Sequence, residues 1–141
     1  SLNLATHVQD VADDVAANRA RLAHTLNLPG PPRWLTQVHG TRCVDAATIG
    51  APVDADAAWT DRPGVVCAIL TADCLPILLC DRAGTRIAAA HAGWRGLCDG
   101  VIASTLAALA VPGADLCAWI GPGIGCAAYA VGPELRERFM A

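Results

Sequence analysis

The fold is decided by residues 76–110, which read PILLCDRAGTRIAAAHAGWRGLCDGVIASTLAALA. A short apolar run at 76–80 leads into the turn sequence DRAG, and a second apolar run follows at 86–91. Runs of this length bounded by turn residues predict two strands, and the short link between them predicts antiparallel pairing. Apolar side chains then recur at helical spacing over 97–110, until Pro112-Gly113 ends the pattern. The centre of the chain therefore predicts strand, strand and helix.

The segments on either side extend this pattern to the order α-β-β-β-β-β-β-α-β-α. We expect helices at 10–27, with Asp10 as the cap, and at 133–140, strands at 34–38, 42–46 and 116–120, and a hairpin of 55–60 with 65–70 around the turn 61–64. Short links between strands imply antiparallel pairs, and one helical crossover implies a parallel pair. The sequence thus predicts one α/β (α+β) domain over residues 1–141, with a mixed sheet and flanking helices.

The composition favours a globular domain that does not bind nucleic acid. The chain is 54% hydrophobic and 16% charged, its formal net charge is −3, and its ten basic residues are all Arg. It therefore lacks the basic patch needed to neutralise phosphates along a nucleic acid. The apolar stretch 63–80 is interrupted by Asp73, and the stretch 116–133 by Gly and Pro. Neither predicts a membrane span.

The termini and the cysteines indicate the compartment. The first ten residues lack the basic and apolar regions of a signal peptide. They also lack an initiator Met, so we expect residues upstream of Ser1. Seven cysteines, an odd number, lie mostly in apolar runs, which favours a reducing cytoplasm over a disulfide framework. The apolar composition is compatible with a homodimer.

Three short motifs supply the residue types of a catalytic metal site. They are VHG at 38–40, TADC at 71–74 and HAGWRG at 91–96, and they contribute His39, Cys74 and His91. Two imidazoles and one thiolate are a ligand set that leaves a coordination position open. Each residue also has an ordinary interpretation: either histidine can be structural, and the cysteine can be a small buried hydrophobe. Asp56 and Asp73 are the acids that could orient a histidine.

The segment Gly93-Trp-Arg-Gly96 predicts a possible phosphate site. A strand, a glycine turn and a helix start bring backbone N–H groups and the Arg95 guanidinium toward one point, with Gly93 and Gly96 allowing close approach. A tight turn with Trp94 as a packing anchor explains the same residues equally well. The glycine-rich loop 121–126 matches a phosphate-binding fingerprint only weakly.

Six segments together resemble a known family. They are SLNL at 1–4, QVHG at 37–40, ADAAWT at 55–60, TADCLP at 71–76, AAAHAGWRG at 88–96 and WIGPGIG at 119–125. Over its whole length the chain is similar to the YfiH-type family. This family is also known as the laccase-domain or multi-copper polyphenol oxidoreductase family, and its members are regarded as purine nucleoside phosphorylases.

The resemblance implies a fold, a site and an activity. The fold is an α/β sandwich of the type shared with cytotoxic necrotising factor-like cysteine hydrolases. His39, Cys74 and His91 are the catalytic residues and the ligands of zinc, with copper as the alternative. The substrates are purine nucleosides and phosphate: adenosine, inosine and S-methyl-5'-thioadenosine are converted to base and sugar 1-phosphate, and adenosine is also deaminated. Family members continue past Met140 and begin before Ser1, so we expect the chain to be incomplete at both ends.

Three other functions stay open on the sequence. Cys74 could be the nucleophile of a cysteine hydrolase or amidase, with His91 as its base. The chain could be a copper-dependent polyphenol oxidase, although it has four histidines and His7 and His24 lie away from the three motifs in sequence. Finally, it could be a binding module that a metal stabilises without catalysis.

Overall fold

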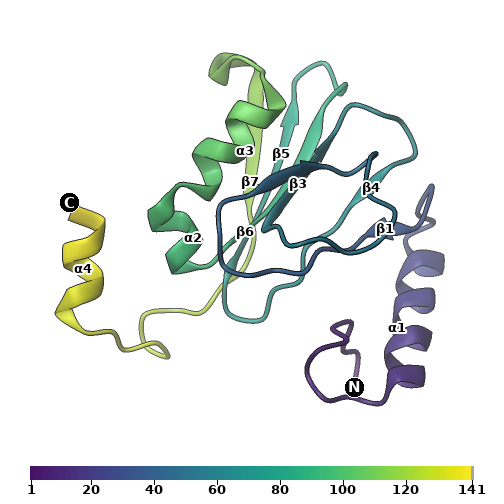
Figure 1. The fold of residues 1–141 in the computed structure, drawn as a ribbon, viewed down its shortest axis with the longest axis horizontal. Coiled ribbons are helices and arrows are strands. Elements are labelled where there is room, and N and C mark those ends of the chain that lie inside the picture. Colours follow the sequence, from purple (N-terminus) through teal and green to yellow (C-terminus); the bar gives the residue numbers. More distant parts are fainter. Residues whose placement is uncertain (141) are drawn as a thin grey trace.

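A mixed five-stranded sheet forms the centre of the computed structural model, which describes residues 1–140 (Figure 1). The strand order is β2-β3-β6-β5-β7. The strands are β2 (Cys43–Asp45), β3 (Ala57–Thr60), β5 (Leu75–Asp81), β6 (Ile87–Ala92) and β7 (Leu116–Ile120). The α/β class with a mixed sheet is therefore confirmed.

The predicted hairpin at the centre of the chain is also confirmed. β5 and β6 pair antiparallel, with Leu75 opposite Ala92 and Cys80 opposite Ile87. Asp81 fixes the connecting turn, because its carboxylate accepts hydrogen bonds from the hydroxyl and the amide of Thr85 and from the amide of Arg86. The Thr85 hydroxyl, followed by the backbone donors, holds the pKa of Asp81 below its usual value.

The helix predicted at 97–110 is in fact two helices. α2 (Trp94–Asp99) and α3 (Val101–Leu109) meet at Gly100, whose φ of 103° is accessible to glycine at little cost. This crossover does not create the parallel pair that we expected. β6 and β7 run parallel to each other, but β5 lies between them and pairs antiparallel with both.

The predicted hairpin of 55–60 with 65–70 is wrong. β3 pairs with β2 in parallel and with β6 in antiparallel orientation, whereas β4 (Val66–Cys67) joins β1 (Pro32–Arg33) in a separate two-stranded parallel sheet. The strand expected at 34–38 is reduced to a single bridge between Thr36 and Asp54. The turn at 61–64 therefore carries the chain out of the main sheet instead of folding it back.

Alanines let layers pack closely on both faces of the sheet. On one face, Ala57, Ala88 and Ala90 lie under α3, whose Val101 and Leu109 are fully buried. The opposite face is covered by a smaller cluster that includes Leu35, Ala46, Ala55 and Ala58 and the partly buried Cys67. Burial raises the pKa of the Cys67 thiol to about 12, with the charges of Cys43 and Asp45 adding to the effect.

The helices at the two ends of the chain lie on opposite sides of the molecule (Figure 1). α1 (Ala12–Thr25) buries Val15. Asp10 does not cap this helix as predicted: Val11 is at the cap position, and the Asp10 carboxylate accepts the Val11 amide. α4 (Pro133–Met140) follows the prediction and has no buried residue among those described.

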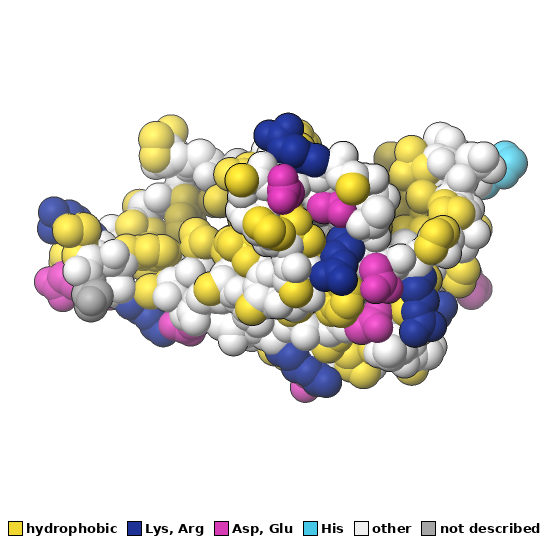
Figure 2. Space-filling model, turned by 90° about the horizontal axis from the view of Figure 1, so that it is seen from above, with side chains coloured by type: hydrophobic (Ala, Val, Ile, Leu, Met, Phe, Trp, Pro, Cys, Tyr) yellow, Lys and Arg dark blue, Asp and Glu magenta, His cyan; other side chains and the backbone are white. Residues whose placement is uncertain are grey.

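Much apolar surface is exposed beyond these layers. The edge strand β7, which follows a 3₁₀ turn at Gly113–Asp115, leaves Trp119 and Ile120 more than half exposed. Figure 2 shows hydrophobic side chains between interspersed basic and acidic ones on one face. Among residues 1–140, no helix has both the length and the apolar character needed to cross a membrane.

Candidate metal centre

His39, Cys74 and His91 converge on one point, as the resemblance implies. His39 lies in a turn before β2, Cys74 in the bend that leads into β5, and His91 on the buried strand β6. Their candidate ligand atoms all lie within 4.8 Å of one another. The Sγ atom of Cys74 is 3.9 Å from Nε2 of His39, and the two imidazole rings meet edge to face.

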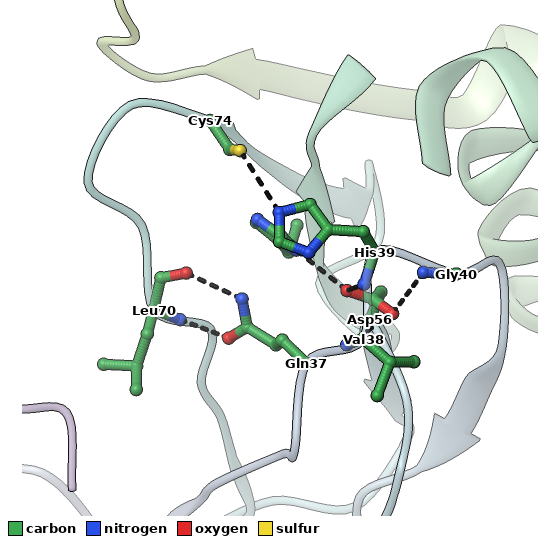
Figure 3. A network of polar contacts seen from close by, with 8 residues as sticks. Gln37, Val38, His39, Gly40, Asp56, Leu70 and Cys74 are labelled. Carbon is green, nitrogen blue, oxygen red and sulfur yellow. Dashed lines mark hydrogen bonds and ion pairs between the residues drawn. The ribbon is translucent and has the colours of Figure 1, made fainter. Parts of the chain in front are cut away.

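The fully buried carboxylate of Asp56 organises two of these residues (Figure 3). Oδ1 of Asp56 accepts hydrogen bonds from Nδ1 of His91 at 2.8 Å and from the amide of His39 at 2.9 Å. Its Oδ2 accepts the amides of Val38 and Gly40 at 3.2 and 2.7 Å. His39 has a φ of 58°, an uncommon conformation for a residue other than glycine, and these bonds hold it there.

Asp56 is thus the acid that orients a histidine, one of two candidates in the sequence. The other, Asp73, has an exposed side chain, and its backbone oxygen accepts the Ile124 amide at 2.9 Å. Because Nδ1 of His91 faces the Asp56 carboxylate, Nε2 is the nitrogen with a lone pair available to a metal. A carboxylate behind a ligating histidine is the usual arrangement in metal sites.

Gln37 is a positioning residue that the sequence reasoning missed. Its side-chain amide donates to the carbonyl of Leu70 at 2.7 Å and its side-chain oxygen accepts the Leu70 amide at 2.6 Å (Figure 3). This pair of bonds joins the segment before His39 to the segment before Cys74. Its only signal in the sequence is that it directly precedes the VHG motif, and a polar residue there has many other uses.

Gly93 and Gly96 allow helix α2 to pack against the ligands. A Cβ atom on Gly93 would lie 2.8 Å from Cδ2 of His39 and 3.0 Å from Sγ of Cys74. On Gly96 it would lie 2.7 Å from the carbonyl oxygen of Gly40. Both glycines therefore have a packing role in addition to the phosphate role that the sequence suggested.

The donor set and its spacing fit a zinc-type ion. With bonds of about 2.0–2.3 Å, tetrahedral zinc separates its ligand atoms by about 3.3–3.8 Å. Sγ of Cys74 and Nε2 of His39 are 3.9 Å apart, and all three candidate ligand atoms lie within 4.8 Å of one another. Burial, followed by the negative charges of Asp73 and Asp56, raises the pKa of the Cys74 thiol above its usual value. A bound cation reverses this effect and stabilises the thiolate. The His-Cys-His cluster, together with the family described below, suggests metal binding.

Two cavities open onto the cluster. The larger, about 660 Å³, is lined by all three candidate ligands, by residues 70–73 and by the N-terminal segment, including His7. The smaller, about 370 Å³, is lined by His39 and Cys74 together with Trp94, Arg95 and Tyr129. His7 is far from the motifs in sequence, but the fold brings it to the same cavity as His39, Cys74 and His91. His24 lies in the last turn of α1.

The comparison with known families agrees with these motifs. The sequence profile of the family described as multi-copper polyphenol oxidoreductase laccase matches residues 1–141. The chain belongs to this family. The resemblance inferred from the six segments is therefore confirmed.

Individual members of the laccase-domain family are similar over the whole chain. A purine nucleoside phosphorylase of Pseudomonas aeruginosa is 52% identical over 141 residues, and the purine nucleoside phosphorylase YfiH of Escherichia coli is 51% identical over 144 residues. These alignments cover 100% of this chain and 57% and 58% of the two relatives. The chain thus spans somewhat more than half of their length.

Solved structures share the fold. A crystal structure of a Neisseria meningitidis protein has a TM-score of 0.93 and 48% sequence identity, and covers 99% of this chain and 57% of its own. YlmD from Geobacillus stearothermophilus has a TM-score of 0.88 and 31% identity, and covers 98% of this chain and 57% of its own. The fold described above is therefore the fold of this family.

Proposed function

We propose that the protein is a zinc-dependent purine nucleoside phosphorylase that also deaminates adenosine. The observation that carries the proposal is the His39–Cys74–His91 cluster at the junction of two cavities. Two cavities that meet at one centre suit a reaction between two substrates. The names of the Pseudomonas aeruginosa and Escherichia coli relatives support phosphorolysis of a purine nucleoside.

The residues of the chain prepare the site in defined ways. Asp56 holds the Nδ1 hydrogen of His91 and fixes the turn that carries His39, so both imidazoles are oriented before substrate arrives. When bound, zinc supplies Lewis acidity and lowers the pKa of water toward about 7. This chemistry suits deamination, in which water replaces the 6-amino group of adenine and ammonia leaves.

Phosphorolysis needs an anion beside C1' of the sugar. In this step the bond from C1' to the purine nitrogen breaks, and a phosphate oxygen forms the new bond to C1'. Arg95 lines the smaller cavity with His39 and Cys74, and its guanidinium lies 4.5 Å from the centre of the Trp94 ring. We assign phosphate to this cavity, with Arg95 as the cation that neutralises it and Gly93 and Gly96 at the adjoining helix start.

The first rival function is a cysteine hydrolase, because the resemblance implies a fold type shared with such enzymes. In that mechanism, Cys74 attacks a carbonyl as a thiolate. The raised pKa of Cys74 opposes it, and the contact of its sulfur is with His39 rather than with His91, the base that we first considered. A copper oxidase and a non-catalytic module are the remaining rivals. The cytoplasmic location and the homodimer stay predictions.

Metal analysis of the purified protein, followed by incubation with adenosine with and without phosphate, tests the proposal. We expect about one zinc per chain, adenine formation that depends on phosphate, and inosine formation that does not. His39→Ala, Cys74→Ala and His91→Ala should each lose metal and both activities together. Metal retained with activity lost in Cys74→Ala would favour the nucleophilic cysteine. Copper with phenol oxidation, or a metal-loaded protein inert toward nucleosides, would favour the other rivals.

A further inference from the structure

The N-terminal segment forms one wall of the larger cavity at the metal centre. Residues 2–5, 7 and 8 line this cavity together with residues 70–73 and with His39, Cys74 and His91. The segment has no regular secondary structure and precedes α1 (Figure 1). We name residues 2–8 the N-terminal strap.

Helix α1 fixes the first half of the strap. Nδ2 of Asn18 donates to the carbonyl oxygens of Ser1 at 3.2 Å and Asn3 at 3.0 Å, and Nε of Arg19 donates to that of Leu4 at 2.8 Å. The Asn3 side chain bonds both the amide and the carbonyl of Ala5. These bonds determine the path of the chain as it crosses the cavity.

The second half of the strap is free to meet a ligand. Within residues 1–140, no hydrogen bond joins residues 6–9 to the rest of the protein. The side chains of Leu2 and Val8 are 73% and 52% exposed although they line a cavity, and His7 beside Val8 is also exposed. Apolar walls with a few polar groups are typical of small-molecule sites, and the volume of about 660 Å³ is in their usual range.

Charge separates the roles of the two cavities. Asp73 lines both cavities, and among the described residues that line the larger one no Lys or Arg is found. The smaller cavity contains the Arg95 guanidinium. An uncharged, flat ring with polar edges suits the larger cavity, whereas the guanidinium that would pair with a phosphate lies in the smaller one.

We propose that the N-terminal strap is the purine-recognition wall of the site and that His7 is its specificity-determining residue. The imidazole of His7 makes the polar contact to an edge of the purine, while Leu2 and Val8 cover its faces. This inference rests on the proposed function, because it deepens the assignment of a nucleoside to this centre.

Binding of inosine and of hypoxanthine, measured by calorimetry in the absence of phosphate, tests the proposal without turnover. Loss of one hydrogen bond and its ring contact in His7→Ala should weaken both ligands about 3- to 10-fold, with metal content and the unfolding midpoint unchanged. The matched control His24→Ala changes an exposed histidine on α1 and should bind like the wild type. Equal binding by His7→Ala, or loss of its metal, would overturn the proposal.

A second variant changes the strap without touching the cavity. Asn18→Ala removes two bonds that fix the strap and should weaken both ligands in the same way, whereas the exposed control Asp14→Asn should not. Unchanged affinity in Asn18→Ala would show that the path of the strap does not matter.

The proposed function and the strap can fail separately. If the wild type binds inosine but phosphate never releases a base, the phosphorylase proposal fails, and the effect of His7→Ala on affinity still decides the strap. If phosphorolysis proceeds and His7→Ala binds normally, the strap proposal fails alone.

Discussion

Replacing Asp56 by asparagine changes one oxygen of the fully buried carboxylate that accepts four hydrogen bonds at the candidate metal centre. The side chain keeps its size, so the test concerns hydrogen bonding and charge instead of volume. Each carboxylate oxygen accepts two donors. An NH₂ group in place of Oδ2 faces two backbone donors and satisfies neither. In place of Oδ1 it leaves the His39 amide without an acceptor and favours the His91 tautomer with its hydrogen on Nε2, the nitrogen that would bind a metal.

The expected loss follows from these contacts. A buried donor left without a partner costs about 1–3 kcal/mol, so one or two of them cost about 1–6 kcal/mol. A domain of this size is typically stable by about 5–15 kcal/mol, and the loss is a large part of that. Because the same carboxylate orients His91, we also expect metal affinity to fall about 10- to 100-fold.

Urea unfolding followed by circular dichroism measures the first effect, and competition with a fluorescent zinc chelator measures the second. Asp61→Asn is the control, since Asp61 is exposed and its carboxylate accepts no hydrogen bond from the described residues. If Asp56→Asn kept both the stability and the metal affinity of this control, our account of Asp56 as the organising acid would be wrong.

Three other predictions concern the packing, the central turn and the thiols. Gly96→Ala should lower the unfolding free energy by about 1–3 kcal/mol and weaken metal binding, because its Cβ meets the backbone oxygen of Gly40 in the turn that carries His39. The control Gly50→Ala places its Cβ in open space and should do neither. Equal urea midpoints for the two variants would contradict this prediction. Because the pKa of Asp81 is lowered in the folded state, its ionised carboxylate stabilises the fold at pH values above its unfolded-state pKa of about 3.9. This stability is lost as the pH falls through the folded-state pKa. Asp81→Asn should thus lower the urea midpoint at pH 7, and its difference from the wild type should shrink as the pH falls through the folded-state pKa of Asp81. A difference that stays constant as the pH is lowered would refute the reasoning. At pH 8, iodoacetamide should modify the exposed Cys117 much faster than Cys67, whose pKa is about 12; similar rates in peptide mapping would count against its burial.

The local signals in the sequence predicted elements well and predicted their partners poorly. The hairpin of β5 and β6 followed from two apolar runs and one short turn, a contact between neighbours in the chain. The parallel pairing of β2 with β3 depends on a long connection, and no local pattern encodes it. Gly100 likewise looks like an ordinary residue of one helix until the backbone shows a left-handed conformation.

In the candidate site, too, some residues could be predicted from local sequence and others could not. Its three candidate ligands were found from motifs and a family resemblance, because their residue types are chemically specific. The contacts of Gln37 and the position of His7 at the larger cavity were missed because both depend on segments brought together only by folding. Asp56 was predicted only in part. Its position near the motifs in sequence made it one of two candidate acids, and its burial under the turn of residues 38–40 distinguishes it from Asp73.

The convergence of His39, Cys74 and His91 also has a thermodynamic consequence for the chain as a polymer. The first two lie 35 residues apart in sequence, and the third lies on β6. An ion held by all three acts as a cross-link that closes two long loops, and it binds the folded chain far better than an unfolded one. Stability then increases with the free metal concentration as RT ln(1 + [M]/Kd), so that the midpoint of unfolding reports metal supply as well as sequence.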